Sequence, residues 1–144
     1  MNDENKIKLF LVDDDAMYLR LLEIDFLQQT DFTFESYATG ELCVKNLSNK
    51  PDVIILDYHL DSVEKNAMNG IETLDKIKAF NPNIPVVMLS SQDKIDVAIN
   101  CMHHKAFDYI VKSETAFLRL RKAINNFLHT QKIEKTLSWY MEKI

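Results

Sequence analysis

The sequence predicts an α/β fold, a doubly wound sheet of five parallel strands in the order 2-1-3-4-5. Apolar runs with strand character alternate five times with segments whose apolar residues recur at helical spacing. Several of these runs are apolar on both faces, as parallel strands covered by helices are. Polar and charged residues stand where the runs end, and in such a fold the carboxyl ends of the strands share one edge of the sheet.

The third strand is the clearest of the five. Val53–Leu56 is an unbroken apolar run between a Pro-Asp turn signal and Asp57. A lone carboxylate beside a buried strand needs a charge partner, a metal or a chemical use, although Asp57 could also simply cap the following loop. The predicted strands are Ile7–Val12, Phe32–Tyr37, Val53–Leu56, Ile84–Leu89 and Phe107–Val111.

Each strand is followed by a predicted helix whose start carries a capping or turn residue. For the first four helices these residues are Asp15, Thr39, Asn69 and Asp93. Asp15 is the best example, because the apolar residues of Ala16–Gln29 recur at helical spacing directly after it. The fifth helix begins near Glu114 and meets neither Gly nor Pro before the chain ends, so an extended C-terminal helix is expected.

Composition narrows the class of protein. With 144 residues, 47% of them hydrophobic, the chain can bury the core of one domain. Its net charge of −5 argues against a broad surface for nucleic acid or anionic membrane. The N-terminal segment is polar, and no apolar run approaches the ~20 residues that a bilayer span needs. Cys43 and Cys101 are predicted to be buried, reduced thiols, which indicates a cytoplasmic protein.

Five side chains are expected to meet at the carboxyl edge of the sheet, namely Asp13, Asp14, Asp57, Ser90 and Lys112. If the first and third strands are neighbours, three carboxylates share one cleft, and a hard divalent cation relieves their repulsion most simply. Mg²⁺ is the natural candidate, because it prefers oxygen ligands and often binds one or two carboxylates together with a phosphate. A lysine and a hydroxyl at the same point would neutralise and hydrogen-bond a phosphoryl group. The site is therefore predicted to form an aspartyl phosphate at Asp57.

Four segments together resemble the receiver domain of two-component response regulators, which has a flavodoxin-like fold. They are LVDDD, VIILD, VVMLSS and DYIVK, at the ends of the first, third, fourth and fifth strands, and the resemblance covers about residues 6–128. It implies that Mg²⁺ is held by Asp13, Asp14, Asp57 and the backbone carbonyl of His59, with Asp14 a direct ligand. It also implies that Asp57 is the phosphoacceptor, that Ser90 and Lys112 contact the phosphoryl group, and that Tyr109 is the switch aromatic.

Three of these residues also have a purely structural interpretation. Lys112 could be a solvated charge, Ser90 a turn residue and Tyr109 a packing residue. The chain also departs from the family pattern. Ser113 follows Lys112 where most receivers have a proline joined by a cis bond, and the loop after Asp57 is about five residues longer than usual. His59 and Gln92 occupy positions that tune the lifetime of the aspartyl phosphate in the family.

The expected function is Mg²⁺-dependent phosphoryl transfer from a histidine kinase or phosphotransfer protein to Asp57, which drives a conformational switch. Such a domain assists its own phosphorylation and dephosphorylation and is not otherwise an enzyme. One alternative is a phosphohydrolase of the haloacid-dehalogenase kind, but those enzymes usually carry an acid two residues after the nucleophile, where this chain has His59. The other alternative is a receiver-like interaction module that carries no phosphate.

The expected domain division is a receiver at residues 1–128 and a helical extension at residues 129–144. The extension carries a second apolar stripe, made of Ile133, Leu137, Tyr140, Met141 and Ile144. Two interpretations stay open at this stage. The stripe forms a homodimer or leads to an output domain absent from this chain, or the segment folds back on its own domain or frays.

Overall fold

Five parallel strands form one sheet in the order β2-β1-β3-β4-β5, as the alternation predicted. They are β1 (Ile7–Val12), β2 (Phe32–Tyr37), β3 (Val53–Asp57), β4 (Val86–Ser90) and β5 (Asp108–Val111). The computed structural model describes residues 6–144. Residues 1–5, which belong to the polar N-terminal segment predicted to carry no targeting sequence, lie outside the described part of the chain.

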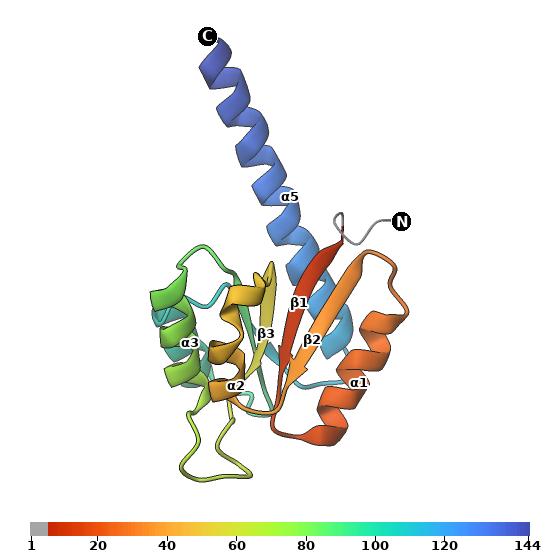
Figure 1. Ribbon diagram of the computed structural model, residues 1–144, viewed down its shortest axis with the longest axis vertical. Coiled ribbons are helices and arrows are strands. Elements are labelled where there is room, and N and C mark those ends of the chain that lie inside the picture. The colour runs from red at the N-terminus through yellow and green to blue at the C-terminus, as the bar shows by residue number, and fades with distance from the viewer. Residues whose placement is uncertain (1–5) are drawn as a thin grey trace.

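Helices cover both faces of the sheet (Figure 1). They are α1 (Ala16–Leu27), α2 (Gly40–Lys45) with a 3₁₀ turn (Leu47–Asn49), α3 (Gly70–Phe80), α4 (Ile95–His103) and α5 (Ala116–Lys143). Buried residues of α1 and α5 pack on one face, and those of α2, α3 and α4 pack on the other. This two-sided cover is the physical reason why the strands are apolar on both faces.

Strand β3 lies at the centre, and all five of its residues are buried. Ile54 and Leu56 join the core on the α3 side, whereas Val53 and Ile55 join the core on the α1 side. Cys43 and Cys101 are both buried and free, as predicted. Burial raises the pKa of the Cys43 thiol to about 12, so this sulfur stays protonated and behaves as a small apolar group.

Several predicted boundaries differ from the structure by one or two residues, and the starts of β4 and α4 are two of them. Strand β4 begins at Val86 rather than Ile84, because Pro85 has no N–H to donate to the ladder and only its carbonyl pairs, with the N–H of Ile54 (3.0 Å). Asp93 was expected to cap the fourth helix, but α4 begins at Ile95, and its N-cap residue Lys94 makes no side-chain capping bond. In the preceding loop, the N–H of Gln92 donates to Ser90 Oγ and its carbonyl accepts the Tyr109 hydroxyl.

The Asn69-Gly70 pair closes the long loop after β3. Asn69 and Glu72 form a capping box at the start of α3. Gly70 lies so close to the end of β3 that a Cβ on it would stand 2.6 Å from the carbonyl oxygens of Asp57 and Tyr58. Only glycine permits this approach, which brings the start of α3 directly against the strand that carries Asp57.

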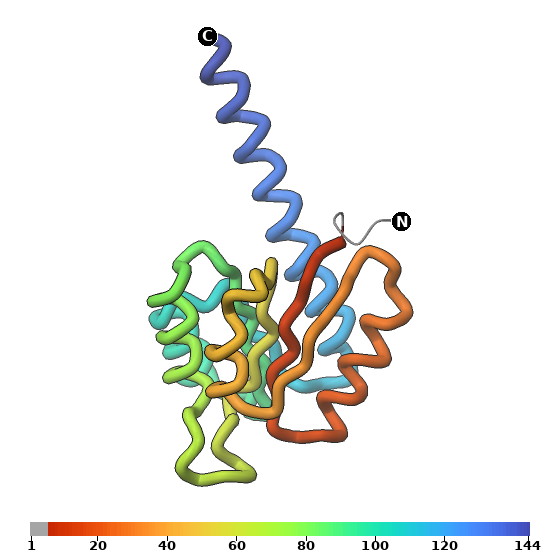
Figure 2. Tube along the Cα trace, in the orientation of Figure 1, coloured from red at the N-terminus to blue at the C-terminus, as the bar shows by residue number. Residues whose placement is uncertain are grey.

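Helix α5 is continuous for 28 residues and extends well beyond the sheet. Figure 2 shows it leaving the domain at the end opposite to the long loop between β3 and α3. Residues 129–143 therefore project as a helix rather than fold back on the domain, and all residues from 129 to 144 are exposed. Among the helices of residues 6–144, none combines the length and hydropathy that a membrane span requires.

Candidate functional site

Three carboxylates meet at the carboxyl edge of the sheet. Asp13 follows β1 and Asp57 ends β3, and these two strands are direct neighbours. Asp13 and Asp57 are 0% and 3% exposed, and Asp14 is half-buried. One oxygen from each of the three carboxylates lies within 4.8 Å of the others. The structure thus places the three predicted acids in one cluster.

Lys112 follows β5 and reaches across this edge to the cluster. Its Nζ lies 2.9 Å from Asp13 Oδ2 and 3.3 Å from Asp57 Oδ1, and its side chain is 13% exposed. Burial alone would lower the pKa of Lys112, but the hydrogen bond to Asp13 and the charges of Asp57 and Asp13 outweigh it and raise this pKa. Lys112 is therefore a fixed positive charge, and the interpretation of it as a freely solvated lysine does not fit.

Asp57 is a buried acid whose pKa is raised well above its usual value. Burial, and then the negative charge of Asp13, raise the pKa of Asp57 to about 8, although Lys112 and the backbone N–H of His59 act in the opposite direction. A carboxyl group with such a pKa is partly protonated near neutral pH. Additional positive charge beside it would favour the ionised form.

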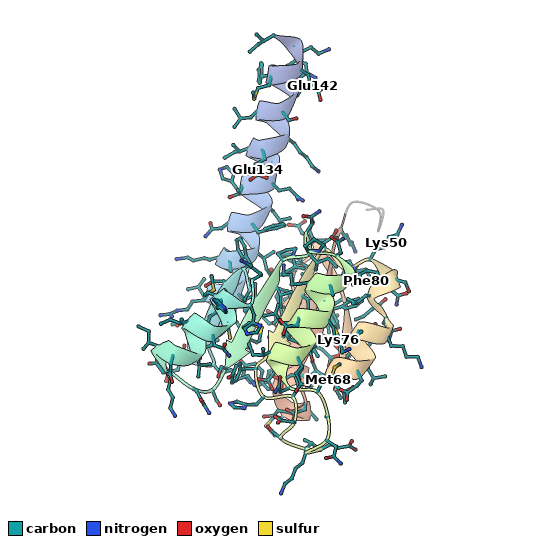
Figure 3. The ribbon with its side chains drawn as sticks, turned by 90° about the vertical axis from the view of Figure 1, so that its left-hand side faces the viewer. Lys50, Met68, Lys76, Phe80, Glu134 and Glu142 are labelled. Carbon is teal, nitrogen blue, oxygen red and sulfur yellow. The ribbon has the colours of Figure 1, made fainter. Side chains whose placement is uncertain are left out.

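The half-buried Asp14 is held by the long loop. Its Oδ2 accepts hydrogen bonds from the backbone N–H groups of Ser62 (2.9 Å) and Val63 (3.2 Å). The loop between β3 and α3 lies at the carboxyl ends of the strands, below the sheet in Figure 1. At its other end, the N–H of Met68, marked in Figure 3, donates to Glu41 Oε2 (3.1 Å). Backbone groups of this long segment thus contact both Asp14 and Glu41.

We expect Asp14→Ala to raise the rate of trypsin cleavage after Lys65 roughly tenfold, because the loop loses two hydrogen bonds to a charged acceptor. Lys65 is exposed within this loop. Peptide mapping of metal-free protein during a short digestion measures the rate. Asp61→Ala, which removes a carboxylate of the same loop, serves as the control. Equal cleavage of Asp14→Ala and wild type would show that Asp14 does not hold the loop.

Ser90 ends β4 and is 0% exposed. Its Oγ accepts the N–H of Gln92 (3.0 Å), and its carbonyl accepts the N–H of Lys112 (2.8 Å). The predicted switch residue Tyr109 is half-buried, and its hydroxyl donates to the carbonyl of Gln92. Ser90 and Tyr109 are thus joined through one loop residue, so a rotation of the Ser90 hydroxyl would disturb the contact of Tyr109.

Asp14 and Asp57 border a cleft of about 680 Å³, whereas Asp13 is not among its lining residues. It is lined by Asp14, Asp15, Ala16, Asp57, His59, Ser62, Val63, Ser91 and Lys112. Ser90 is not among the lining residues, whereas its neighbour Ser91 is. Sequence reasoning also missed Ser62 and Val63, because they act through backbone N–H groups that every residue except proline carries.

His59 lines the same cleft. Its ring makes an edge contact with Tyr58, with 4.9 Å between the ring centroids. Its carbonyl accepts the Ser62 hydroxyl (3.4 Å), and its Nε2 is buried without a hydrogen-bond partner among the described residues. The Lys112–Ser113 bond, which the sequence left undecided, is trans.

The donor set fits a hard divalent cation. All three clustered groups are carboxylates, the ligand type that Mg²⁺ prefers. Burial, and then the charge of Asp13, raise the pKa of Asp57, so a cation bound beside it would favour its ionised form. The residues present therefore suit Mg²⁺ by both ligand chemistry and charge.

Comparison with known proteins supports the observed fold and identifies the family. The family model described as the response regulator receiver domain matches residues 9–125. The chain belongs to this family. A receiver domain from Methanospirillum hungatei, described as CheY-like, superposes with a TM-score of 0.77 at 21% identity, covering 90% of this chain and 98% of that one. The sheet order predicted from sequence is thus the order of a known receiver fold.

Curated relatives contain a receiver within a longer protein. A protein-glutamate methylesterase/protein-glutamine glutaminase from Clostridium acetobutylicum is 37% identical over 118 residues, which cover 78% of this chain and 32% of that protein. The regulatory protein LuxO from Vibrio cholerae is 30% identical over 81% of this chain and 24% of its own length. This receiver therefore spans only a quarter to a third of the length of these two relatives.

Proposed function

We propose that this receiver domain accepts a phosphoryl group on Asp57 from a histidine kinase or phosphotransfer protein, in a reaction that requires Mg²⁺. The observation that carries the proposal is the position of Asp57, which borders an open cleft while Asp13 and Lys112 lie against it. An acid nucleophile, a second acid and a lysine at one point are the groups that phosphoryl transfer needs.

In this proposal Asp13, Asp14, Asp57 and the carbonyl of His59 hold the metal. Bound there, Mg²⁺ would offset negative charge on the carboxylates and on the incoming phosphoryl oxygens. An oxygen of ionised Asp57 forms the new bond to phosphorus while the bond from phosphorus to the donor's imidazole nitrogen breaks. Lys112 Nζ, already 3.3 Å from Asp57 Oδ1, contacts a phosphoryl oxygen. The domain in this way assists a transfer to itself and turns over no separate substrate.

The change at Asp57 is then transmitted through β4 and β5. A phosphoryl oxygen draws the Ser90 hydroxyl away from the N–H of Gln92, which it accepts at 3.0 Å in this structure. Tyr109 contacts the same residue, so the loop before α4 and the ring of Tyr109 move together. This local rearrangement changes the molecular surface near α4 and β5.

Intact mass after incubation with acetyl phosphate and Mg²⁺ tests the proposal. A gain of one phosphoryl group, absent when EDTA replaces Mg²⁺, is expected. No gain under any metal condition would favour an interaction module that carries no phosphate. Rapid hydrolysis of a panel of phosphate esters would favour a phosphohydrolase instead.

We further propose that residues 129–144 are a separate functional segment, which mediates homodimer formation or leads toward an output domain. Figure 3 marks Glu134 and Glu142 on this projecting part of α5. Its apolar residues at Ile133, Leu137, Tyr140 and Ile144 are spaced four, three and four apart and are 46%, 57%, 58% and 104% exposed. This spacing is that of a coiled-coil seam, and such a seam is stable only against a partner.

Beryllofluoride, which imitates a phosphoryl group on Asp57, is expected with Mg²⁺ to shift the monomer-dimer balance measured by sedimentation velocity. Leu137→Glu should remove the dimer, because it places a charge in the middle of the apolar stripe. Ser138→Glu, one position outside the stripe, is the matched control. Identical sedimentation of wild type with and without beryllofluoride would leave the extension without a role in signalling.

A further inference from the structure

The ammonium group of Lys112 is bounded by three contacts, of which only two belong to the acidic cluster. Nζ lies 2.9 Å from Asp13 Oδ2 and 3.3 Å from Asp57 Oδ1. The third contact is the ring of Tyr18, whose centroid lies 4.3 Å from Nζ. We propose that Tyr18 is a positioning residue for phosphoryl transfer, which holds Lys112 in the cleft through the face of its ring. The inference rests on the proposed function of Asp57 and Lys112.

Tyr18 is itself fixed by two neighbours. Asp15 caps α1 and accepts hydrogen bonds from the N–H groups of Met17 (3.0 Å) and Tyr18 (3.3 Å), so the first turn of the helix has one orientation. The Tyr18 ring packs edge-on against Phe117 of α5, with 5.8 Å between ring centroids. The ring is thus held between α1 and α5 beside Lys112, and it needs no rearrangement to meet the ammonium group.

The hydroxyl of Tyr18 does not explain the presence of the residue. This oxygen is buried and has no hydrogen-bond partner within residues 6–144. A buried, unpaired hydroxyl is unfavourable, so the hydroxyl contributes nothing to the local structure that phenylalanine would lack. The aromatic face is the part of the side chain that contacts a group of the site.

An aromatic face has a property that the two carboxylates lack. The attraction of Asp13 and Asp57 for Lys112 weakens once other positive charge is shared with them, as the proposed reaction requires. The attraction between an ammonium group and a ring quadrupole does not depend on those carboxylates, and it is stronger where water is excluded. Tyr18 therefore keeps Lys112 beside Asp57 at the stage when Lys112 must turn to a phosphoryl oxygen.

The test compares initial rates of labelling by acetyl phosphate at saturating Mg²⁺. Tyr18→Leu is expected to lower the rate roughly tenfold, as the loss of one desolvated ammonium–aromatic contact implies. Tyr18→Phe keeps the ring face and should restore the wild-type rate. Phe32→Leu is the matched control, because Phe32 is a half-buried aromatic residue that packs in the same layer, against Phe26 of α1.

A double-mutant cycle with Lys112→Met separates positioning from general packing. In the Lys112→Met protein, Tyr18→Leu should have no further effect on the labelling rate. The same four proteins unfolded in urea without metal should show a coupling between the two residues, a readout that does not depend on activity.

Three results would overturn the inference while leaving the proposed function standing. They are full labelling of Tyr18→Leu, equal slowing by Tyr18→Leu and Phe32→Leu, and an unchanged effect of Tyr18→Leu when Lys112 is absent. Failure of the wild-type protein to gain a phosphoryl group would overturn the proposed function, and the inference with it.

Discussion

Asp57→Asn is expected to reduce the phosphoryl gain from acetyl phosphate to background while the protein stays folded. The amide has nearly the shape of the carboxyl group but offers no ionised oxygen to attack phosphorus. Asp57 is 3% exposed and lies beside Asp13 and Lys112. An amide cannot ionise, so it also avoids the repulsion that ionised Asp57 has with Asp13. The loss of labelling should therefore occur without a loss of stability.

Intact mass with acetyl phosphate and Mg²⁺ measures the effect, and urea unfolding confirms that the variant is folded. Asp61→Asn is the matched control, because it changes an acid of the adjoining loop and should be labelled like the wild type. Equal labelling of Asp57→Asn and wild type would show that the phosphoryl group resides elsewhere and would refute the choice of acceptor.

The affinity for Mg²⁺ is expected to rise roughly tenfold for each pH unit below about pH 8 and to level off above it. Burial and the charge of Asp13 raise the pKa of Asp57 to about 8, so below that pH a bound cation must displace a proton. In the metal-free protein the same shift in pKa affects stability with the opposite sign, because folding favours the protonated form of Asp57. The stability that protonated Asp57 contributes is present at acidic pH, below its usual pKa of 3.8, and is lost as the pH rises through 8.

Titration calorimetry at several pH values between 6 and 9 measures how the affinity for Mg²⁺ changes with pH. Asp57→Asn removes the titrating group and should flatten the dependence, which separates Asp57 from the other acids of the cluster. A wild-type affinity that is constant across this range would contradict both the raised pKa and the role of Asp57 as a ligand.

The meeting of the carboxyl ends of the strands at one edge was predictable, because the alternation of apolar runs with helical segments allows few topologies. Val53–Leu56 was identified as a central strand from its apolar run alone, and the placement of Asp57 and Lys112 at one edge followed from the parallel sheet. Ser90 was harder to place. Its hydroxyl is buried and accepts the N–H of Gln92, while Ser91 is among the residues that line the cleft, and the sequence does not say which of two adjacent serines is buried.

For the long loop and the last helix as well, the sequence predicted the segment but not its contacts or its direction. The sequence indicated an extra stretch between Asp57 and Asn69, but not that it would reach back to Asp14 through two backbone N–H groups. It also left open whether residues 129–144 project or fold back. The structure has them in one continuous helix with α5, and no residue of the stripe from Ile133 to Ile144 is buried.

The sequence by itself determined the alternation of strands and helices and the residues at the strand ends, because periodicity is a property of the chain. With the common strand order 2-1-3-4-5, this predicted that three acids meet one lysine. Only the tertiary structure decided which groups surround those side chains: the ring of Tyr18 beside Lys112 and the loop N–H groups on Asp14. The physical reason is that such contacts use an aromatic face or a peptide group, which occur throughout the chain and become specific only when packing brings them within a few ångströms of a charge.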